Sequence, residues 1–192
     1  ADYIEFDGQL LVWLVNLVLF KKKIKRRSFD MTSVAPIIFK DSCEDEKSIF
    51  MVGSTQENIE KFVITIKNMY SNINFIGYSN GYLNECAKQE LTQKIIGLKA
   101  DYVVVGMGTP LQEEFLFNLK SSGFDGQGYT CGGFIHQTAK DINYYPKFYN
   151  KYNLRWLYRI LDEPKLLKRY LLYYPLSICL FTFDAIRYKL IF

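Results

Sequence analysis

The feature that most constrains the fold of this chain is a short apolar run that ends at a glycine and is followed by helical spacing. Residues 101–105 read Asp-Tyr-Val-Val-Val before Gly106, and residues 48–52 lead into Gly53 in the same way. Continuous runs of β-branched and aromatic residues favour strands that are covered on both faces. Strands of this kind belong to parallel sheets, because helices must cross between them.

The pattern continues on both sides of these two runs. Residues 74–78 and 126–131 are further strand candidates, and apolar residues at helical spacing occupy the segments between the strands, among them residues 110–120. This alternation predicts an α/β fold, a Rossmann-like, mostly parallel sheet with helices on both faces. Such sheets bind ligands at the carboxyl ends of their strands.

The composition changes after Pro146. Residues 151–192 hold eight Lys/Arg against three Asp/Glu, whereas the rest of the chain holds 16 against 17. We therefore predict two domains, an α/β core in residues 1–146 and a C-terminal helical basic appendage in residues 147–192. Uneven charge suggests an anionic partner, a phosphate, a lipid head group or a nucleic acid. The core is not basic and carries no RNA- or DNA-binding motif, so we expect no nucleic-acid partner.

The N-terminal region holds an apolar segment, residues 10–20, followed by a basic run in residues 21–27. A signal peptide has its charges before the apolar stretch, and eleven residues are too few to span a bilayer. We predict a buried helix and a solvated basic turn. The chain starts at Ala1 inside apparent structure, so we expect a fragment that lacks the first part of the core. Its four cysteines form no CxxC pair and are predicted to be free thiols in a reducing cytoplasm.

Glycine-bearing turns follow three of the predicted strands. They are Gly53-Ser54-Thr55, Gly106-Met107-Gly108-Thr109 and Cys131-Gly132-Gly133. Backbone N–H groups in such turns can approach an anion at the next helix's N-terminus. A predicted helix then begins with Pro110, Gln112 and Glu113. The side chains of Gln112 and Glu113 either hydrogen-bond a sugar or a nucleobase, or the segment is only a tight turn in which Glu113 interacts favourably with the helix dipole.

A few side chains are candidates for proton transfer and phosphate binding. Asp7 is either a helix N-cap or a carboxylate general base at the mouth of a site. His136, the single histidine, is either a satisfied, partly buried residue or a proton carrier or phosphate contact. The last candidates are Arg155, Arg159, Lys168 and Arg169. They either bind phosphate oxygens, the arginines in bidentate fashion, or form a solvated basic helix face.

Together these pieces resemble the WecG/TagA/CpsF glycosyltransferases, family 26 of the glycosyltransferases, from Asp7 to about Tyr170. Residues 108–113 are similar to the family's G-x-P-x-Q-E, and residues 154–159 to its L-E-W-L-Y-R. Other agreements are Phe6-Asp7-Gly8, Arg27, Gly77-x3-Gly81-Tyr82, Glu163-Pro164 and Arg169-Tyr170.

The resemblance implies an inverting, metal-independent enzyme without a cofactor. It moves a hexose or an N-acetylhexosamine of the N-acetylmannosamine type from a UDP-sugar to an undecaprenyl-diphosphate-linked sugar, for teichoic acid, common antigen or capsule. It implies Asp7 as the general base and a cytoplasmic enzyme that is peripheral on the inner face of the bacterial cell membrane. His136 is our own second candidate for the base, apart from the resemblance. The implied substrate-binding residues of the core are Arg27, Gly53, Gly106, Gly108, Pro110, Gln112, Glu113, Gly132 and Gly133. Arg155, Arg159 and Arg169 are also implied to bind substrate. They belong to an appendage that closes over the site and meets the membrane surface.

Several positions depart from the family pattern around the implied site. His136 stands where the family often has Asp, Arg155 where Glu is usual, and residues 144–146 and 28–33 replace an Arg-Ala-Pro and a Gly-x-Asp. The donor sugar and the acceptor are therefore less determined than the fold. The alternative is a non-catalytic, membrane-associated scaffold or sugar-nucleotide-binding relative. A homo-oligomer is compatible with the sequence.

Overall fold

The computed structural model describes residues 7–18 and 24–191, and the side chains of Val18, Lys165, Arg169 and residues 188–191 lie outside the described part. The end of the predicted apolar helix and the first three lysines of the basic run also lie outside it. The chain forms two compact units, Ala1–Asp7 with Arg26–Tyr144, and Gly8–Lys25 with Tyr145–Phe192. The predicted domain division at residue 146 stays a prediction, because compactness alone does not show which segments fold independently.

The first unit is built on a sheet in which all the described strands are parallel. The strands are β1 (Ile49–Gly53), β2 (Phe75–Ser79), β3 (Tyr102–Gly106) and β4 (Gln127–Thr130), in the spatial order β2-β1-β3-β4. The predicted Rossmann-like α/β fold is confirmed, and each strand begins one residue after the start of the predicted run. The central strands β1 and β3 are buried along their whole length, which is why their sequences are continuously apolar.

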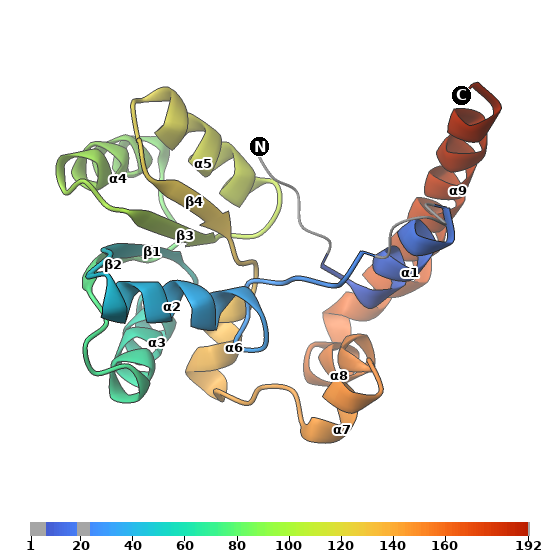
Figure 1. Cartoon of the computed structure of the whole chain (residues 1–192), viewed down its shortest axis with the longest axis horizontal. Helices are drawn as coiled ribbons and strands as arrows, with labels where there is room; N and C mark the ends of the chain where they lie inside the picture. Colours follow the sequence, from blue (N-terminus) through green and yellow to red (C-terminus); the bar gives the residue numbers. More distant parts are fainter. Residues whose placement is uncertain (1–6, 19–23, 192) are drawn as a thin grey trace. The chain divides into compact units, whose positions relative to one another are not determined.

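Helices cover both faces of this sheet (Figure 1). One face carries α2 (Val34–Glu44), α3 (Gln56–Met69) and α6 (Phe134–Lys140), and the other carries α4 (Glu85–Gly97) and α5 (Leu111–Ser121). Because successive strand residues point to opposite faces, Met51 and Val104 enter the first of these cores while Phe50 and Val103 enter the second. Burying each such side chain stabilises the fold by about 1.5–3 kcal/mol.

The second unit is helical, and its C-terminal part confirms the predicted helical segment. Its elements are α1 (Gln9–Val18), α7 (Lys147–Lys151), α8 (Arg155–Asp162), a 3₁₀ turn η1 (Pro164–Leu166), a π-helical turn η2 (Arg169–Tyr173) and α9 (Tyr174–Ile191). Helix α1 is only half-buried, since Val12 and Val15 are covered but Trp13 and Leu17 are exposed. The prediction of a buried helix was therefore right for one face only. Among the described helices, none is long and apolar enough to cross a membrane.

Candidate functional site

The carboxyl ends of the central strands meet at the point where the strand order reverses. The chain leaves β1 for β2 on one side and later returns to β3 on the other, so β1 and β3 are neighbours in the sheet. Gly53 and Gly106 are paired in register at this edge. In open α/β sheets a ligand binds in the crevice at such a switch point.

The glycines here are required because the backbones of the turns touch. A Cβ on Gly53 would lie 2.5 Å from the Gly106 carbonyl oxygen, and one on Gly106 would lie 2.7 Å from that of Gly132. Gly53 also has φ +148°, which side chains rarely adopt. The three predicted glycine turns therefore come together as one backbone surface.

The loop after β2 belongs to the same edge. The N–H of Gly81 donates to the carbonyl of Ser54 over 2.9 Å, and a Cβ on Gly81 would lie 3.0 Å from Gly53 Cα and 3.2 Å from Met107 Cγ. The next residue, Tyr82, is 80% exposed. We did not predict Tyr82 as a site residue. The sequence signal that could have identified it is the pair Gly81-Tyr82 directly after a predicted strand, at the same edge of the sheet as the other glycine turns.

A polar network connects the turns after β3 and β4. Gln112 is 6% exposed, and its Oε1 accepts a hydrogen bond from the Gly132 N–H at 3.2 Å. Its Nε2 donates to Glu113 Oε1 at 2.8 Å, and Thr109 Oγ1 donates to the same carboxylate oxygen at 3.2 Å. The polar atoms of Gln112 are thus engaged inside the protein, while Glu113 is exposed.

The remaining predicted residues of these turns lie at the helix starts. Pro110 follows a cis peptide bond with Thr109 and precedes α5 as its N-cap residue, and Gly133 holds the same position before α6. Neither helix has a side-chain cap. Gly108 is exposed and has φ +80°.

His136 lies on the outer side of α6 and is exposed. Its Nδ1 is 3.2 Å from the amide Nδ2 of Asn58 on α3. Because an amide N–H can only donate, Nδ1 is placed to accept this hydrogen bond. The structure therefore presents His136 to solvent rather than burying it in the core. Asn58 was missed, since nothing in the sequence signals a contact between these two helices.

Asp7 is 65% exposed and pairs with a residue that we had not predicted. The Arg26 guanidinium approaches Asp7 Oδ1 at 2.9 Å and Asp30 Oδ2 at 3.1 Å. Burial lowers the pKa of Arg26, but the two carboxylates outweigh it and the pKa is raised above its ordinary value. Arg27, the predicted residue, is exposed. The basic run has no helix or strand periodicity, so the sequence did not indicate whether Arg26 or Arg27 is the less exposed arginine.

Phe29 connects this charged cluster to the edge of the sheet. Its ring lies 5.7 Å from that of Phe134, the first residue of α6, and 5.5 Å from that of Tyr129 on β4. Phe29 stands between Arg26 and Asp30 in the sequence and is buried. The Asp7–Arg26–Asp30 cluster is therefore anchored beside the β4–α6 turn.

The predicted arginines of the second unit differ in their surroundings. Arg155 donates from Nε to Asn150 Oδ1 at 2.6 Å and stacks 4.8 Å from the Tyr145 ring centre. Arg159 Nε is buried and has no hydrogen-bond partner within the described part of the chain. Burial raises the pKa of nearby Tyr170 to about 12, although the positive charge of Arg159 acts in the opposite direction. The Arg169 side chain lies outside the described part.

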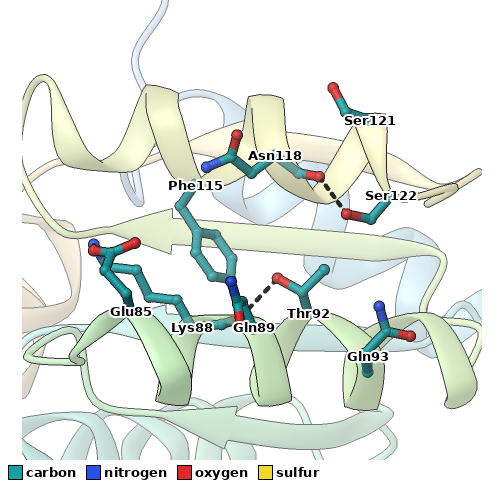
Figure 2. Close-up of a pocket in the computed structure, with 9 residues that line it drawn as sticks. All are labelled: Glu85, Lys88, Gln89, Thr92, Gln93, Phe115, Asn118, Ser121 and Ser122. Atoms are coloured by element: carbon teal, nitrogen blue, oxygen red, sulfur yellow. Dashed lines mark hydrogen bonds and ion pairs between the residues drawn. The ribbon is translucent and has the colours of Figure 1, made fainter.

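The structure also contains an open groove of about 390 Å³ on one face of the first unit, between α4 and α5 (Figure 2). It is lined by Glu85, Lys88, Gln89, Thr92, Gln93, Phe115, Asn118, Ser121 and Ser122. Several of its polar groups have partners within the wall, since Lys88 pairs with Glu85 and the Thr92 hydroxyl donates to a backbone carbonyl of α4. It lies along the helices and not at the strand ends, so we do not assign it as the ligand site.

These features define a class. A parallel sheet whose glycine turns touch at the switch point is typical of Rossmann-like proteins, which bind their ligands at the carboxyl ends of their strands. Residues 1–190 match the Glycosyl transferase WecG/TagA/CpsF family. The chain belongs to this family, and the predicted glycosyltransferase is confirmed.

Two relatives show the breadth of the match. The chain is 35% identical over 174 residues, 91% of its length, to a UDP-Gal:alpha-D-GlcNAc-diphosphoundecaprenol beta-1,4-galactosyltransferase from Shigella boydii, and it covers 73% of that protein. It is 25% identical over 171 residues, 89% of its length, to an N-acetylglucosaminyldiphosphoundecaprenol N-acetyl-beta-D-mannosaminyltransferase from Bacillus spizizenii, of which it covers 65%. The chain therefore spans about two thirds to three quarters of the length of these relatives.

Proposed function

We propose that this chain transfers a hexose, with inversion, from a UDP-sugar to an N-acetylglucosamine carried on undecaprenyl diphosphate. The observation that carries the proposal is the contact of Gly53 with Gly106 at the switch point, which leaves backbone rather than side chains facing the ligand. The names of the two relatives supply the acceptor. The relative that is 35% identical uses UDP-galactose, so galactose is the proposed sugar, with N-acetylmannosamine as the second.

The donor diphosphate fits better at the start of α3 than at the start of α5. Glu57, in the first turn of α3, pairs with Lys61 at 2.7 Å, so its charge is partly balanced. The first turn of α5 carries both Glu113 and Glu114, which oppose an anion at that helix end. The N-terminus of α3, directly after Gly53-Ser54-Thr55, therefore offers the more favourable field for the diphosphate.

The proposed chemistry is a displacement at the anomeric carbon. The Asp7 carboxylate takes the proton of the acceptor hydroxyl, the hydroxyl oxygen bonds to the anomeric carbon, and the bond from that carbon to UDP breaks with its electron pair leaving on UDP. We propose that no metal ion is needed. Arg159 and Arg169 act as phosphate clamps, and an anionic oxygen would satisfy the buried Arg159 Nε.

We further propose that the second unit rests on the inner face of the cell membrane. Leu172, Leu176, Leu180 and Phe183 are all more than half exposed, and their spacing of three or four residues places them on one side of the helical segment. Lys168 and Arg187 lie near its two ends and are exposed. An apolar stripe with flanking cations suits a helix that lies in the interface of an anionic membrane.

The test is an assay of the whole chain with N-acetylglucosaminyl-diphosphoundecaprenol and a panel of UDP-galactose, UDP-glucose, UDP-N-acetylglucosamine and UDP-N-acetylmannosamine. We expect UDP release and a disaccharide-lipid product with UDP-galactose, at a rate that excess EDTA does not change. The anomeric configuration of the product, read by NMR, reports inversion. If no donor yields product while UDP still binds, the chain is a non-catalytic sugar-nucleotide-binding relative.

A further inference from the structure

Three carboxamide side chains line the groove between α4 and α5 and have no hydrogen-bond partner within the described part of the chain. Gln89 and Gln93 come from α4, and Asn118 comes from α5. Gln89 and Gln93 are one helical turn apart, so their Cβ atoms lie roughly 5–6 Å from each other on one wall. A carboxamide can both donate and accept hydrogen bonds. Both walls of the groove therefore offer donors and acceptors to a ligand (Figure 2).

Two hydroxyl groups that line the groove are held in a fixed orientation. The Thr92 hydroxyl donates to the backbone carbonyl of Lys88, and the Ser122 hydroxyl donates to that of Asn118, both at 2.8 Å. Because each proton is used in this way, each hydroxyl oxygen is left to accept. The groove thus combines carboxamides that can turn toward a ligand with acceptors that are already in place.

The charge and the small apolar surface of the groove exclude several kinds of ligand. Lys88 pairs with Glu85 at 2.6 Å, and the other described residues that line the groove are neutral, whereas a phosphate or a nucleic acid requires cations that are available to it. Phe115 is only 2% exposed, so a lipid or an amphipathic helix has little apolar surface to pack against. The walls are helices rather than the edge of a strand, so an extended peptide has no ladder to join.

We propose that this groove binds a neutral saccharide of one or two sugar rings. Sugar hydroxyls both donate and accept hydrogen bonds, as the carboxamides of Gln93 and Asn118 do, so a ring that lies between the two walls can be bonded from both sides. The volume of about 390 Å³ falls within the range of roughly 300–1,000 Å³ that is typical of small-molecule sites. The inference goes beyond the proposed transfer reaction, because no step of that reaction uses this groove.

The test follows the amide signals of the whole, isotope-labelled chain by NMR during a titration with N-acetyllactosamine, a neutral disaccharide. We expect the side-chain amide signals of Gln89, Gln93 and Asn118 to shift together, with a Kd of roughly 1 mM, since about four hydrogen bonds of ordinary net strength give an affinity of this order. A capped, uncharged Gly-Ser peptide at the same concentrations should leave these signals unchanged.

Two variants test the walls separately. Gln93→Ala and Asn118→Ala should each weaken binding of the disaccharide by roughly 2- to 10-fold, and the double variant by roughly 4- to 100-fold, because each change removes one hydrogen-bonding group. Asn68→Ala is the matched control, since Asn68 is exposed on α3, and its Kd should stay within about twofold of wild type. The three positions are exposed, so the variants should fold, which the dispersion of their NMR signals checks.

Several results would overturn the inference. If the three groove signals do not shift well above the expected Kd, the disaccharide does not bind there. Shifts confined to the backbone signals of Gly53 and Gly106 would place the sugar at the strand ends, so the groove assignment would fall and the proposed reaction would stand. An equal weakening by N68A and N118A, or an equal response to the peptide, would show general polar contact instead of a saccharide site. A chain that binds the disaccharide in the groove but transfers no sugar would keep this inference and lose the proposed function.

Discussion

The side-chain oxygen of Gln112 accepts a hydrogen bond from the backbone N–H of Gly132 at 3.2 Å, and so connects the start of α5 to the turn after β4. Sequence reasoning offered Gln112 as a contact for a sugar or a nucleobase. In the structure both polar atoms of the Gln112 side chain have partners within the protein, because its amide nitrogen donates a hydrogen bond to the Glu113 carboxylate. Gln112 therefore acts on the site through the position of the Gly132 turn.

Gln112→Ala should destabilise the first unit by about 1–3 kcal/mol, because the partly buried Gly132 N–H loses its acceptor and the loss of the buried Gln112 side chain leaves a small void. Urea unfolding followed by circular dichroism measures this change. The control is Gln93→Ala, the same substitution at an exposed position of α4, which should stay within about 0.5 kcal/mol of wild type. Equal stabilities of the two variants would show that the Gln112–Gly132 bond contributes nothing.

Gly53→Ala should be strongly destabilising, by about 2–3 kcal/mol or more. Its Cβ would meet the Gly106 carbonyl oxygen at 2.5 Å, a backbone atom that cannot move aside, and its φ of +148° is unfavourable for alanine. Gly97→Ala provides the contrast, since nothing lies within 4 Å of its added Cβ in α4, and it should be neutral or stabilise by up to about 1 kcal/mol. Thermal unfolding distinguishes the two, and a G53A variant as stable as G97A would contradict the close packing of the turns.

The sheet could be predicted from sequence because its central strands are covered on both faces. Continuous apolar runs such as residues 101–105 leave little alternative to a buried parallel strand, and a glycine that follows such a run indicates where it ends. The one-residue offset at the starts of β1 and β3 has a local cause. Asp101 and Ser48 bond to each other across the amino edge of the sheet before the ladders begin, and such a pairing of side chain with backbone has no sequence periodicity.

The site was predictable only in part. Glycines after strands identified the turns, since tight approach of backbones requires them. The partner of Asp7 could not be chosen, because Arg26 and Arg27 are chemically identical and lie in a segment without helix or strand. The exposure of Tyr82 depends on how the β2 loop lies across Gly53, a contact between residues far apart in the chain that no local pattern reports.

Asp101→Asn tests a pH-dependent contribution to stability. Hydrogen bonds from the Ser48 N–H and hydroxyl, and then from Lys47, lower the pKa of Asp101 to about 2. The folded protein therefore binds this proton less readily than the unfolded chain, so the stabilisation is present above about pH 4 and is lost as the pH falls toward 2. D101N should cost about 1 kcal/mol at pH 7, and its difference from wild type should close by about pH 2–3. The control is Asp125→Asn at an exposed position, whose free energy of unfolding should differ little from wild type at every pH. If the destabilisation by D101N did not change with pH, this linkage would be contradicted.

Arg159→Met should raise stability and lower activity. The buried Nε of Arg159 has no partner among the described residues, and replacing such a group by an apolar side chain of similar length should stabilise the second unit by about 0.5–2 kcal/mol. Transfer should fall at least about tenfold if this group binds phosphate. In Arg155→Met the bond to Asn150 and the contact with Tyr145 are lost, so stability should fall instead. Thermal unfolding and the transfer assay give both readouts, and a destabilised R159M would show that Arg159 is a structural residue.

Asp7→Asn tests the proposed base directly. The amide keeps the size of the side chain but cannot take the acceptor's proton, so kcat should fall by about 10²- to 10⁴-fold while UDP binding is unchanged. Asp30→Asn is the matched control, because Asp30 is the other carboxylate that contacts Arg26 yet is not assigned a role in proton transfer. D30N should lower stability and retain the rate within about tenfold. If D7N transferred sugar at a near-normal rate, the base would lie elsewhere, and His136, whose Nδ1 accepts a hydrogen bond from Asn58, would be the next residue to substitute.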